Sequence, residues 1–277
     1  MLNAVAKKPS HSKFNIHNSK FFLCTTNLPG VKKYSNLIFG LRPIIEAIEA
    51  GKTIDKLIVQ KGLSGDLYNE LRQHVKAHRI PIQSVPVERL NRFTKKNHQG
   101  VVGFLSPVEF HSLGDVVTRV FEEGQTPLIV VLDRITDVRN FGAIVRTAEC
   151  AGAHAVVVPQ RGGAAINPDA AKTSAGALFR VPICRENNIH QAISFLQNSG
   201  LQVVGCTEKT ENSLYKVDYT VPTAILMGSE EDGISDEAME AADALAQIPM
   251  HGEIGSLNVS VATGIILYEA VRQRATA

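Results

Sequence analysis

The sequence has little cysteine and no long apolar run, and both shortages narrow the class of protein. Its 277 residues contain four cysteines, at positions 24, 150, 184 and 206, and no two of them form a CxxC pair. Scattered cysteines indicate reduced thiols in a reducing compartment, neither a disulfide framework nor a zinc site. No apolar run reaches the roughly 18 residues that a membrane span needs. The sequence therefore predicts a cytoplasmic protein with no membrane partner.

The common cofactor and nucleophile motifs are also missing. No GxGxxG follows a predicted strand, and the GKT at 51–53 lacks the upstream glycine of a phosphate-binding loop because position 46 is Glu46. HExxH and GxSxG are absent as well. These absences weigh against dehydrogenases, kinases and hydrolases. The later histidines are isolated from one another, so we expect no metal: His111, His154, His190 and His251.

Charge is unevenly distributed, although the net charge is only +2. Residues 1–110 contain 17 Lys and Arg against 7 Asp and Glu, whereas residues 111–277 contain 12 against 20. Single basic runs usually only solvate a surface, but an excess over a whole segment predicts that the first part meets a polyanion.

The hydrophobic pattern predicts a basic, disordered tail at 1–33, a small α/β domain at 34–107, a linker at 108–126 and a larger domain at 127–277. The small domain should contain helices at 37–51 and 66–79 and strands at 56–60, 80–85 and 100–106. The linker includes a short helix-like run. A chain of this length is comfortable for two domains.

From residue 127 strands alternate with helices. The predicted strands are 127–133, 154–159, 201–206, 223–228 and 245–250, and the predicted helices are 140–153, 169–178, 188–200 and a last helix after the final strand. Strands this apolar are buried on both faces, which predicts a mainly parallel sheet covered by helices. Ligands bind at the carboxyl ends of such strands, where the glycine-containing segments 133–147, 228–235 and 251–260 should lie.

Three motifs in these segments resemble the SPOUT superfamily, and most closely its RNA ribose 2′-O-methyltransferases. They are NFGAIVRTAECAGA (140–153), ILMGSEEDGIS (225–235) and IPMHGEIGSLNVSVATGIILYEAVR (248–272). FGLRPIIEAI (39–48) and NHQGVVGF (97–104) resemble the ribosomal-protein-like substrate-binding domain of the bacterial branch that methylates a guanosine ribose in 23S ribosomal RNA. The resemblance covers residues 37–274 and implies a trefoil knot, a homodimer and S-adenosylmethionine (AdoMet) as methyl donor, with no metal.

The resemblance also implies which residues form the catalytic centre: Arg146, Asn140, Glu230, Asn258 and Ser256. Simpler roles compete with two of these assignments. Arg146 could form a surface ion pair with Glu149, three residues along a helix, and Asn140 could cap the helix that it begins. For the alternating Ser256, Asn258 and Ser260, capping explains one polar group but not three. Ser174 sits where relatives have a small polar residue implicated in the reaction.

Two further sets of residues follow from the same resemblance. The expected AdoMet-binding residues are Gly228, Ile248, Leu257, Met250 and Thr207. The expected RNA-binding residues are Arg42, Lys95, Lys96, His98 and Gln99, with a turn at Gln99 and Gly100 as the simpler alternative. RNA rather than DNA is the expected partner, because the reacting 2′-hydroxyl exists only in RNA.

Three functions are therefore open at the level of sequence. The first is methylation of a guanosine 2′-hydroxyl in 23S ribosomal RNA. The second is the same reaction on tRNA, and the third is a non-catalytic RNA-binding ribosome assembly factor. The complete set of Asn140, Arg146, Glu230 and Asn258 favours an enzyme.

Overall fold

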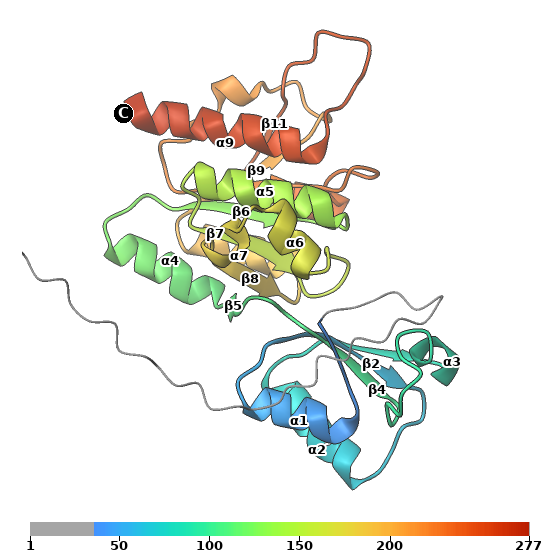
Figure 1. Ribbon diagram of the computed structural model, residues 1–277. Helices are drawn as coiled ribbons and strands as arrows, with labels where there is room; N and C mark the ends of the chain where they lie inside the picture. The colour runs from blue at the N-terminus through green and yellow to red at the C-terminus, as the bar shows by residue number, and fades with distance from the viewer. Residues whose placement is uncertain (1–35, 277) are drawn as a thin grey trace, which may run out of the picture. The chain divides into compact units, whose positions relative to one another are not determined.

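A computed structural model describes residues 36–276 of the chain (Figure 1). The predicted tail at 1–33 lies outside these residues. The described part contains a four-stranded and a seven-stranded sheet, each with its own hydrophobic core. None of its helices is long and apolar enough to cross a membrane.

The four-stranded sheet belongs to the smaller, N-terminal domain, and its strand order is β1-β4-β2-β3. β2 and β3 are parallel, and the other two pairs are antiparallel. One core lies beneath α1 and α2, and a second contains Leu90 of α3. The elements are β1 (Leu37–Phe39), α1 (Leu41–Glu49), β2 (Ile54–Gln60), α2 (Asp66–Ala77), β3 (Ile82–Val85), α3 (Val87–Leu90) and β4 (Val101–Leu105).

The first predicted helix starts later than expected. Residues 37–39 form strand β1, and Gly40, with a φ of 92°, separates this strand from α1. Only glycine adopts that conformation readily, so the chain changes direction there. Within α1, Ile44, Ile45 and Ile48 are buried at helical spacing.

The seven-stranded sheet has the order β11-β9-β10-β6-β7-β8-β5, and every pair of neighbours is parallel. Its strands are β5 (Phe110–His111), β6 (Leu128–Leu132), β7 (Ala155–Pro159), β8 (Ile183–Glu186), β9 (Gln202–Cys206), β10 (Thr223–Met227) and β11 (Ala244–Ala246). This arrangement confirms the predicted α/β class with a mainly parallel larger sheet and a smaller domain before it.

Helices cover both faces of this sheet. Leu128, Val130 and Leu132 of β6 face the core shared with α5, α6 and α9, whereas Ile129 and Val131 face the core shared with α4, α7 and α8. The strict alternation explains why β6 is apolar at every position, because both faces of a parallel strand are buried. The helices are α4 (Leu113–Glu122), α5 (Val138–Cys150), α6 (Pro168–Thr173), α7 (Ile189–Asn198), α8 (Asp236–Glu240) and α9 (Val259–Thr276).

Several observed elements differ in extent from the predicted ones. Residues 108–126, predicted as a linker with a short helix-like run, contain β5, which pairs with β8, and α4, which packs on the large sheet. The helix predicted at 169–178 ends at Thr173, because Ala175 and Gly176 both have positive φ values, and a short 3-10 helix, η1 (Ala177–Phe179), follows. The strand predicted at 245–250 is only Ala244–Ala246.

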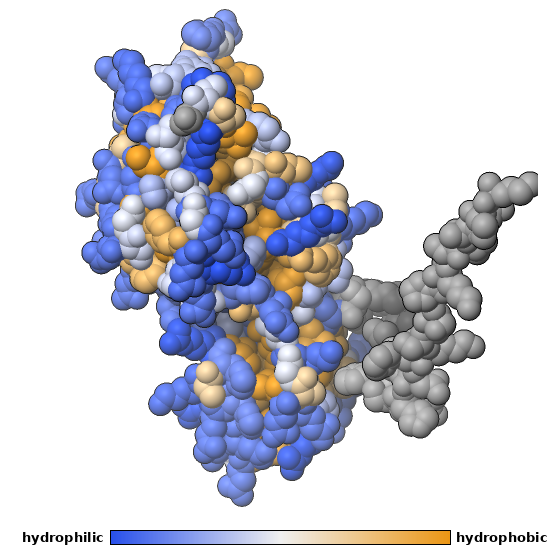
Figure 2. All heavy atoms as spheres, turned by 90° about the vertical axis from the view of Figure 1, so that its left-hand side faces the viewer, coloured by the Kyte–Doolittle hydropathy of each residue, from blue (hydrophilic) through white to orange (hydrophobic). Residues whose placement is uncertain are grey.

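The order of strands reverses between β6 and β10. The chain first proceeds from β6 through β7 to β8, and then returns to the other side of β6 with β9, β10 and β11. In open parallel sheets, ligands bind beyond the carboxyl ends of the strands at such a switch point. The segments that follow β6, β9, β10 and β11 all begin at this edge. Figure 2 shows a mainly hydrophilic surface on one side of the molecule, interrupted by hydrophobic patches.

Candidate active site

A cavity of about 480 Å³ lies at the carboxyl ends of β9 and β10 and beside the segment that follows β11. All five residues that the sequence predicts as AdoMet-binding line this cavity: Thr207, Gly228, Ile248, Met250 and Leu257. The predicted catalytic residues Glu230 and Ser256 line it as well. The sequence motifs and the switch point of the sheet therefore indicate the same place.

Gly228 begins the loop that forms one wall of the cavity. A Cβ atom at this position would lie 2.0 Å from the backbone carbon of Gly233 and 2.0 Å from the nitrogen of Ile234. The loop folds back on itself through two hydrogen bonds, in which Ser229 and Gly233 each donate a backbone N–H to the other's carbonyl, at 2.9 and 3.0 Å. Only glycine fits at 228 because the returning chain occupies the place of a side chain.

Asn258 connects this loop to α5. Its side-chain nitrogen donates to Glu230 Oε1 at 2.5 Å and to Asn140 Oδ1 at 3.1 Å. Its side-chain oxygen accepts from the N–H of Ser260 at 3.0 Å and from the Ser260 hydroxyl at 2.5 Å. Asn258 thus caps α9 and also holds two predicted catalytic residues, so the capping and the functional interpretations are compatible.

Asn140 does not cap α5. Asp137 occupies the N-cap position, where its carboxylate accepts from the N–H groups of Arg139 and Asn140 at 2.7 and 2.9 Å. The Asn140 side chain is free of that task and bonds Asn258 instead. The close approach of α6 to this helix depends on Gly142, since a Cβ there would lie 2.0 Å from Thr173 Oγ1.

Arg146 lies apart from the hydrogen-bonded set. It is exposed on α5, and within the described residues no hydrogen bond or ion pair engages its guanidinium. The alternative ion pair with Glu149 is not formed, because Glu149 pairs with Arg180 at 3.7 Å. The structure therefore brings together Asn140, Glu230 and Asn258, places Ser256 on the cavity wall and leaves Arg146 facing outward.

Ser174 has a structural role. It is fully buried, its hydroxyl donates to the carbonyl of Ala171 at 3.0 Å, and it accepts from the N–H of Leu178 at 3.3 Å. These bonds stabilise the break between α6 and η1. Ser174 therefore has no hydroxyl to offer a substrate.

Sequence reasoning missed Cys206, which ends β9 and lines the cavity. Burial, with a smaller contribution from the charge of Glu208, raises the pKa of its thiol to about 12. The thiol is therefore neutral at physiological pH and acts as an apolar part of the wall. Its position at the last residue of a strand beside the switch point was a usable signal.

The predicted RNA-binding residues divide into exposed and structural ones. Lys95 and Lys96 are exposed, and so is Arg42, which lies 3.6 Å from Glu70. His98 is only 8% exposed, with Nε2 2.9 Å from Asn91 Oδ1 and Nδ1 accepting from the N–H of Gly100.

The fifth predicted residue forms part of a turn. Gln99 has a φ of 51°, and its side-chain oxygen accepts from the N–H of Leu41 at 3.0 Å, at the start of α1. The structure thus favours the turn as the role of His98, Gln99 and Gly100, while the side chains of Arg42, Lys95 and Lys96 are exposed at the surface.

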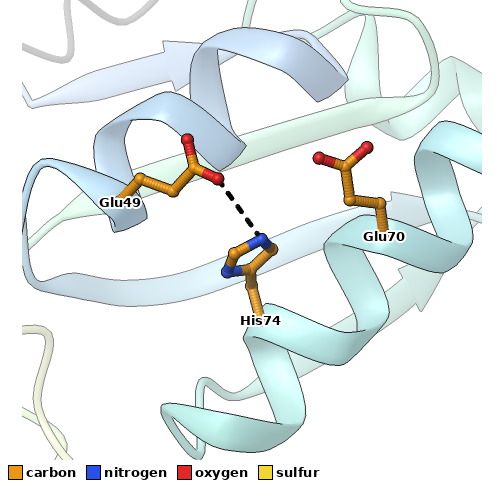
Figure 3. A group of neighbouring side chains, drawn as sticks. All are labelled: Glu49, Glu70 and His74. Atoms are coloured by element: carbon orange, nitrogen blue, oxygen red, sulfur yellow. Dashed lines mark ion pairs between the residues drawn. The ribbon is translucent and has the colours of Figure 1, made fainter.

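Among the described residues, one group of side chains lies close enough together to hold a metal ion: Glu49, Glu70 and His74 (Figure 3). His74 Nε2 lies 3.7 Å from Glu49, and Arg42 pairs with Glu70. The side chains of both glutamates are about half exposed, at 55% and 41%. The arrangement is that of surface ion pairs between α1 and α2, which contribute little to stability.

Comparison with known proteins shows the family of the chain. The sequence model of the SpoU rRNA methylase family matches residues 127–268, and the model of the RNA 2′-O ribose methyltransferase substrate-binding domain matches residues 37–111. The chain belongs to the SpoU rRNA methylase family. The two matches divide the chain near β5, and the resemblance found in the sequence is confirmed at the level of this family.

Relatives from several bacteria match most of the chain. A Staphylococcus saprophyticus protein provisionally named a TrmH family tRNA/rRNA methyltransferase is 32% identical over 238 residues, which are 86% of this chain and 96% of that protein. A Synechocystis protein called an uncharacterised tRNA/rRNA methyltransferase is 34% identical over 241 residues, and the match spans only 63% of its length.

Solved structures of the SpoU family have the same fold. The SpoU methyltransferase AviRb from Streptomyces viridochromogenes, crystallised with AdoMet, is 29% identical, with a TM-score of 0.56 over 87% of this chain and 91% of that one. An AdoMet-bound rRNA methyltransferase from Sinorhizobium meliloti is 29% identical, with a TM-score of 0.54 over 85% of this chain and 86% of that one.

Proposed function

We propose that the chain transfers a methyl group from AdoMet to the ribose 2′-hydroxyl of a guanosine in 23S ribosomal RNA, as a cytoplasmic homodimer. The observation that carries this proposal is the hydrogen-bonded set of Asn140, Asn258 and Glu230 at a cavity closed by the Gly228 loop. The specificity for guanosine and for large-subunit RNA rests on the sequence resemblance. The trefoil knot that the motifs imply, around residues 248–260, is part of the same proposal.

The cavity suits AdoMet in both polarity and charge. Its wall combines apolar side chains, among them Met227, Ile248 and Leu257, with backbone groups of the glycine-containing segments. Four carboxylates border it against one lysine: Glu208, Glu230, Glu231 and Asp232 with Lys209. An acidic rim favours a ligand that carries a sulfonium and an ammonium group, while apolar side chains favour an adenine ring.

The bound donor would supply an electrophilic methyl carbon, and the protein's own residues would align the ribose with it and remove its proton. Asn258 fixes Glu230 at one end of its side chain and the start of α9 at the other. A carboxylate held in this way can accept the 2′-hydroxyl proton as the oxygen attacks. Most of the acceleration would come from alignment.

We assign Arg146 to the RNA and not to proton removal. A guanidinium is very hard to deprotonate, but its fork of donors suits a phosphate and a forming alkoxide. Its exposed position on α5 leaves it available for such a contact. Arg42, Lys95 and Lys96 of the N-terminal domain would hold more distant parts of the RNA.

The outer side of α9 supports the homodimer. Val261 and Tyr268 are 50% and 51% exposed, although the opposite side of this helix is packed in the core through Ile266, Leu267 and Ala270. A helix that is apolar on both sides is usually buried on both sides. A second copy of the chain is the occupant we propose, and sedimentation velocity of the intact protein tests it.

The decisive experiment incubates the protein with labelled AdoMet and protein-free 23S RNA, with bulk tRNA in parallel, and maps any 2′-O-methyl group. We expect one methylated guanosine in the 23S RNA, lost on Arg146→Ala, while Arg180→Ala serves as a control on the same surface. Methylation of tRNA instead would favour the second candidate function. If calorimetry detects no binding of AdoMet, the non-catalytic assembly factor would be the remaining candidate function.

A further inference from the structure

An arginine from another segment holds the cofactor loop, residues 228–234, from outside. Arg134 lies two residues beyond β6. Its Nη1 is 3.4 Å from Asp232 Oδ2, and its Nη2 donates to the carbonyl oxygen of Gly233 at 3.3 Å. Both partners belong to the loop that carries Glu230. Arg134 itself does not line the cavity, so any effect on the reaction must pass through this loop.

The backbone and the inner part of the Arg134 side chain are unusually constrained. Its φ is 59°, in the left-handed region that residues other than glycine rarely adopt. Its Nε is buried without a hydrogen-bond partner among residues 36–276 and lies 3.6 Å from Asp133 Oδ2. Backbone conformations of this kind persist where the surrounding structure fixes them, often at functional sites.

Asp133 and Arg134 contact different parts of the loop. Asp133 is 5% exposed, and its carboxylate accepts from the N–H of Ser235 at 2.7 Å, just beyond the end of the loop. Arg134 bonds residues 232 and 233, close to the tip where Glu230 lies. Asp133 therefore holds the end of the loop and Arg134 its tip, and both residues lie directly after β6.

We propose that Arg134 is a positioning residue for the reaction: by holding Asp232 and Gly233 it keeps Glu230 in place against Asn258 and the loop closed around the donor. The inference rests on the proposed function. An arginine suits the task because its planar guanidinium offers several donors in fixed directions, which a lysine ammonium does not. In the absence of Arg134 the loop would keep its internal bonds between Ser229 and Gly233, and Asp133 would still hold its end, but its tip would lose the contacts to Asp232 and Gly233.

The test compares Arg134→Gly with Arg79→Gly. Glycine tolerates a positive φ, so Arg134→Gly removes the guanidinium without straining the backbone. Arg79 is the matched control, because it is an arginine with a φ of 50° that lies in the N-terminal domain before β3. Arg134→Lys is the conservative variant, and it retains a charge for Asp232.

We expect Arg134→Gly to raise the Kd and the KM for AdoMet by about tenfold, the size of a few modest hydrogen bonds. At saturating AdoMet the bound donor should itself hold the loop closed, with Glu230 against Asn258, so kcat should stay within about threefold of the wild type. Arg134→Lys should recover part of the loss, and Arg79→Gly should change neither constant. A purely structural role would lower thermal stability and the active fraction, and therefore the apparent kcat, without raising the KM for AdoMet.

Amide hydrogen exchange in the protein without AdoMet provides a second readout, independent of activity. The N–H groups of Ser229 and Gly233 should exchange faster in Arg134→Gly than in the wild type or in Arg79→Gly. If the exchange rates and the Kd for AdoMet both match the wild type, the inference is overturned. If the wild type itself binds no AdoMet, the proposed function fails, and the exchange rates alone decide whether Arg134 holds the loop.

Discussion

Two segments border the same cavity, and they are built in opposite ways. The cofactor loop (228–234) is fixed by internal hydrogen bonds, by Arg134 and by the bond between Asn258 and Glu230. Residues 251–257, on the other side, are all exposed. Within the described residues, no hydrogen bond connects 248–257 to the rest of the chain.

The difference indicates a division of work between the two segments. A loop with many bonds is organised before its ligand arrives, so it can position Glu230 at no further cost in conformational entropy. A segment with few contacts opens at little cost in free energy and can become ordered when a ligand supplies the missing contacts. We therefore expect changes in the first to be severe and changes in the second to be mild.

Matched glycine substitutions test this contrast and should give the largest effect. Gly228→Ala forces a Cβ to within 2.0 Å of the returning backbone, whereas Gly255→Ala meets nothing within 4 Å. We expect Gly228→Ala to weaken AdoMet binding by at least about 100-fold and to destabilise the fold by about 3 kcal/mol. Gly255→Ala should change each by little. Calorimetry and urea unfolding measure both quantities.

The contrast breaks if the two alanine variants behave alike. Equal, small effects would mean that the backbone at 228–234 moves aside at low cost and is not pre-organised. Equal, large effects would mean that residues 251–257 are as constrained as the loop opposite.

Asn258 joins the two segments, and its variants separate its two roles. Asn258→Ala removes the cap of α9 and the bonds to Glu230 and Asn140, so we expect a loss of about 1 kcal/mol in stability and about 100-fold in methyl transfer. Asn258→Asp keeps an acceptor for the N–H of Ser260 but places a carboxylate against Glu230. It should retain most of the stability and lose the activity, as measured by urea unfolding and methyl transfer.

An Asn258→Asp variant that transfers methyl groups at the wild-type rate would show that the bond to Glu230 is dispensable. Asn258 would then be only a helix cap, and the comparison between the segments would lose its connecting residue.

Much of this arrangement follows from local sequence. The burial of both faces of β6 follows from its uninterrupted apolar run, and the motif residues Gly228, Ile248 and Leu257 line the cavity. The ends of several helices and strands could not be predicted from the local sequence, because they depend on the backbone conformation of one or two residues. Gly40 separates β1 from α1, and Ala175 with Gly176 ends α6.

Contacts between distant residues could not be predicted from periodicity. Arg134 reaches Asp232, 98 residues later, and Asn258 reaches Asn140 across 118 residues. His98 shows the opposite failure, since its place in a basic segment suggested RNA while its ring is buried in a turn. Sequence patterns report which face of an element is apolar, but not which polar side chains meet.

Hydrogen exchange should sharpen the comparison, with a smaller effect than the substitutions. On adding AdoMet, we expect the amides of residues 251–257 to exchange about tenfold more slowly, because the ligand gives them contacts that they lack. Ser229 and Gly233, already bonded to each other, should change by less. Uniform slowing in both segments would argue that neither is organised in advance, and no slowing at 251–257 would remove that segment from the binding site.

The smallest expected effect concerns Cys206, which ends β9 and lines the cavity that both segments border. Burial raises the pKa of its thiol from 9.0 to about 12. The folded state therefore favours the neutral thiol, and this stability is complete below pH 9 and is lost as the pH rises from 9 towards about 12. At about pH 10 the unfolded chain gains about 1.4 kcal/mol from ionising this thiol.

Cys206→Ala isolates that contribution. The free energy of unfolding in urea should be measured near pH 7 and at about pH 10. Its decrease between these two pH values should be about 1 kcal/mol smaller in the variant than in the wild type. Cys150→Ala is the matched control, because Cys150 is exposed on α5 and its replacement should leave the pH dependence unchanged. An identical pH dependence in Cys206→Ala and the wild type would mean that water reaches this thiol in the folded protein, and that this part of the cavity wall is open to solvent.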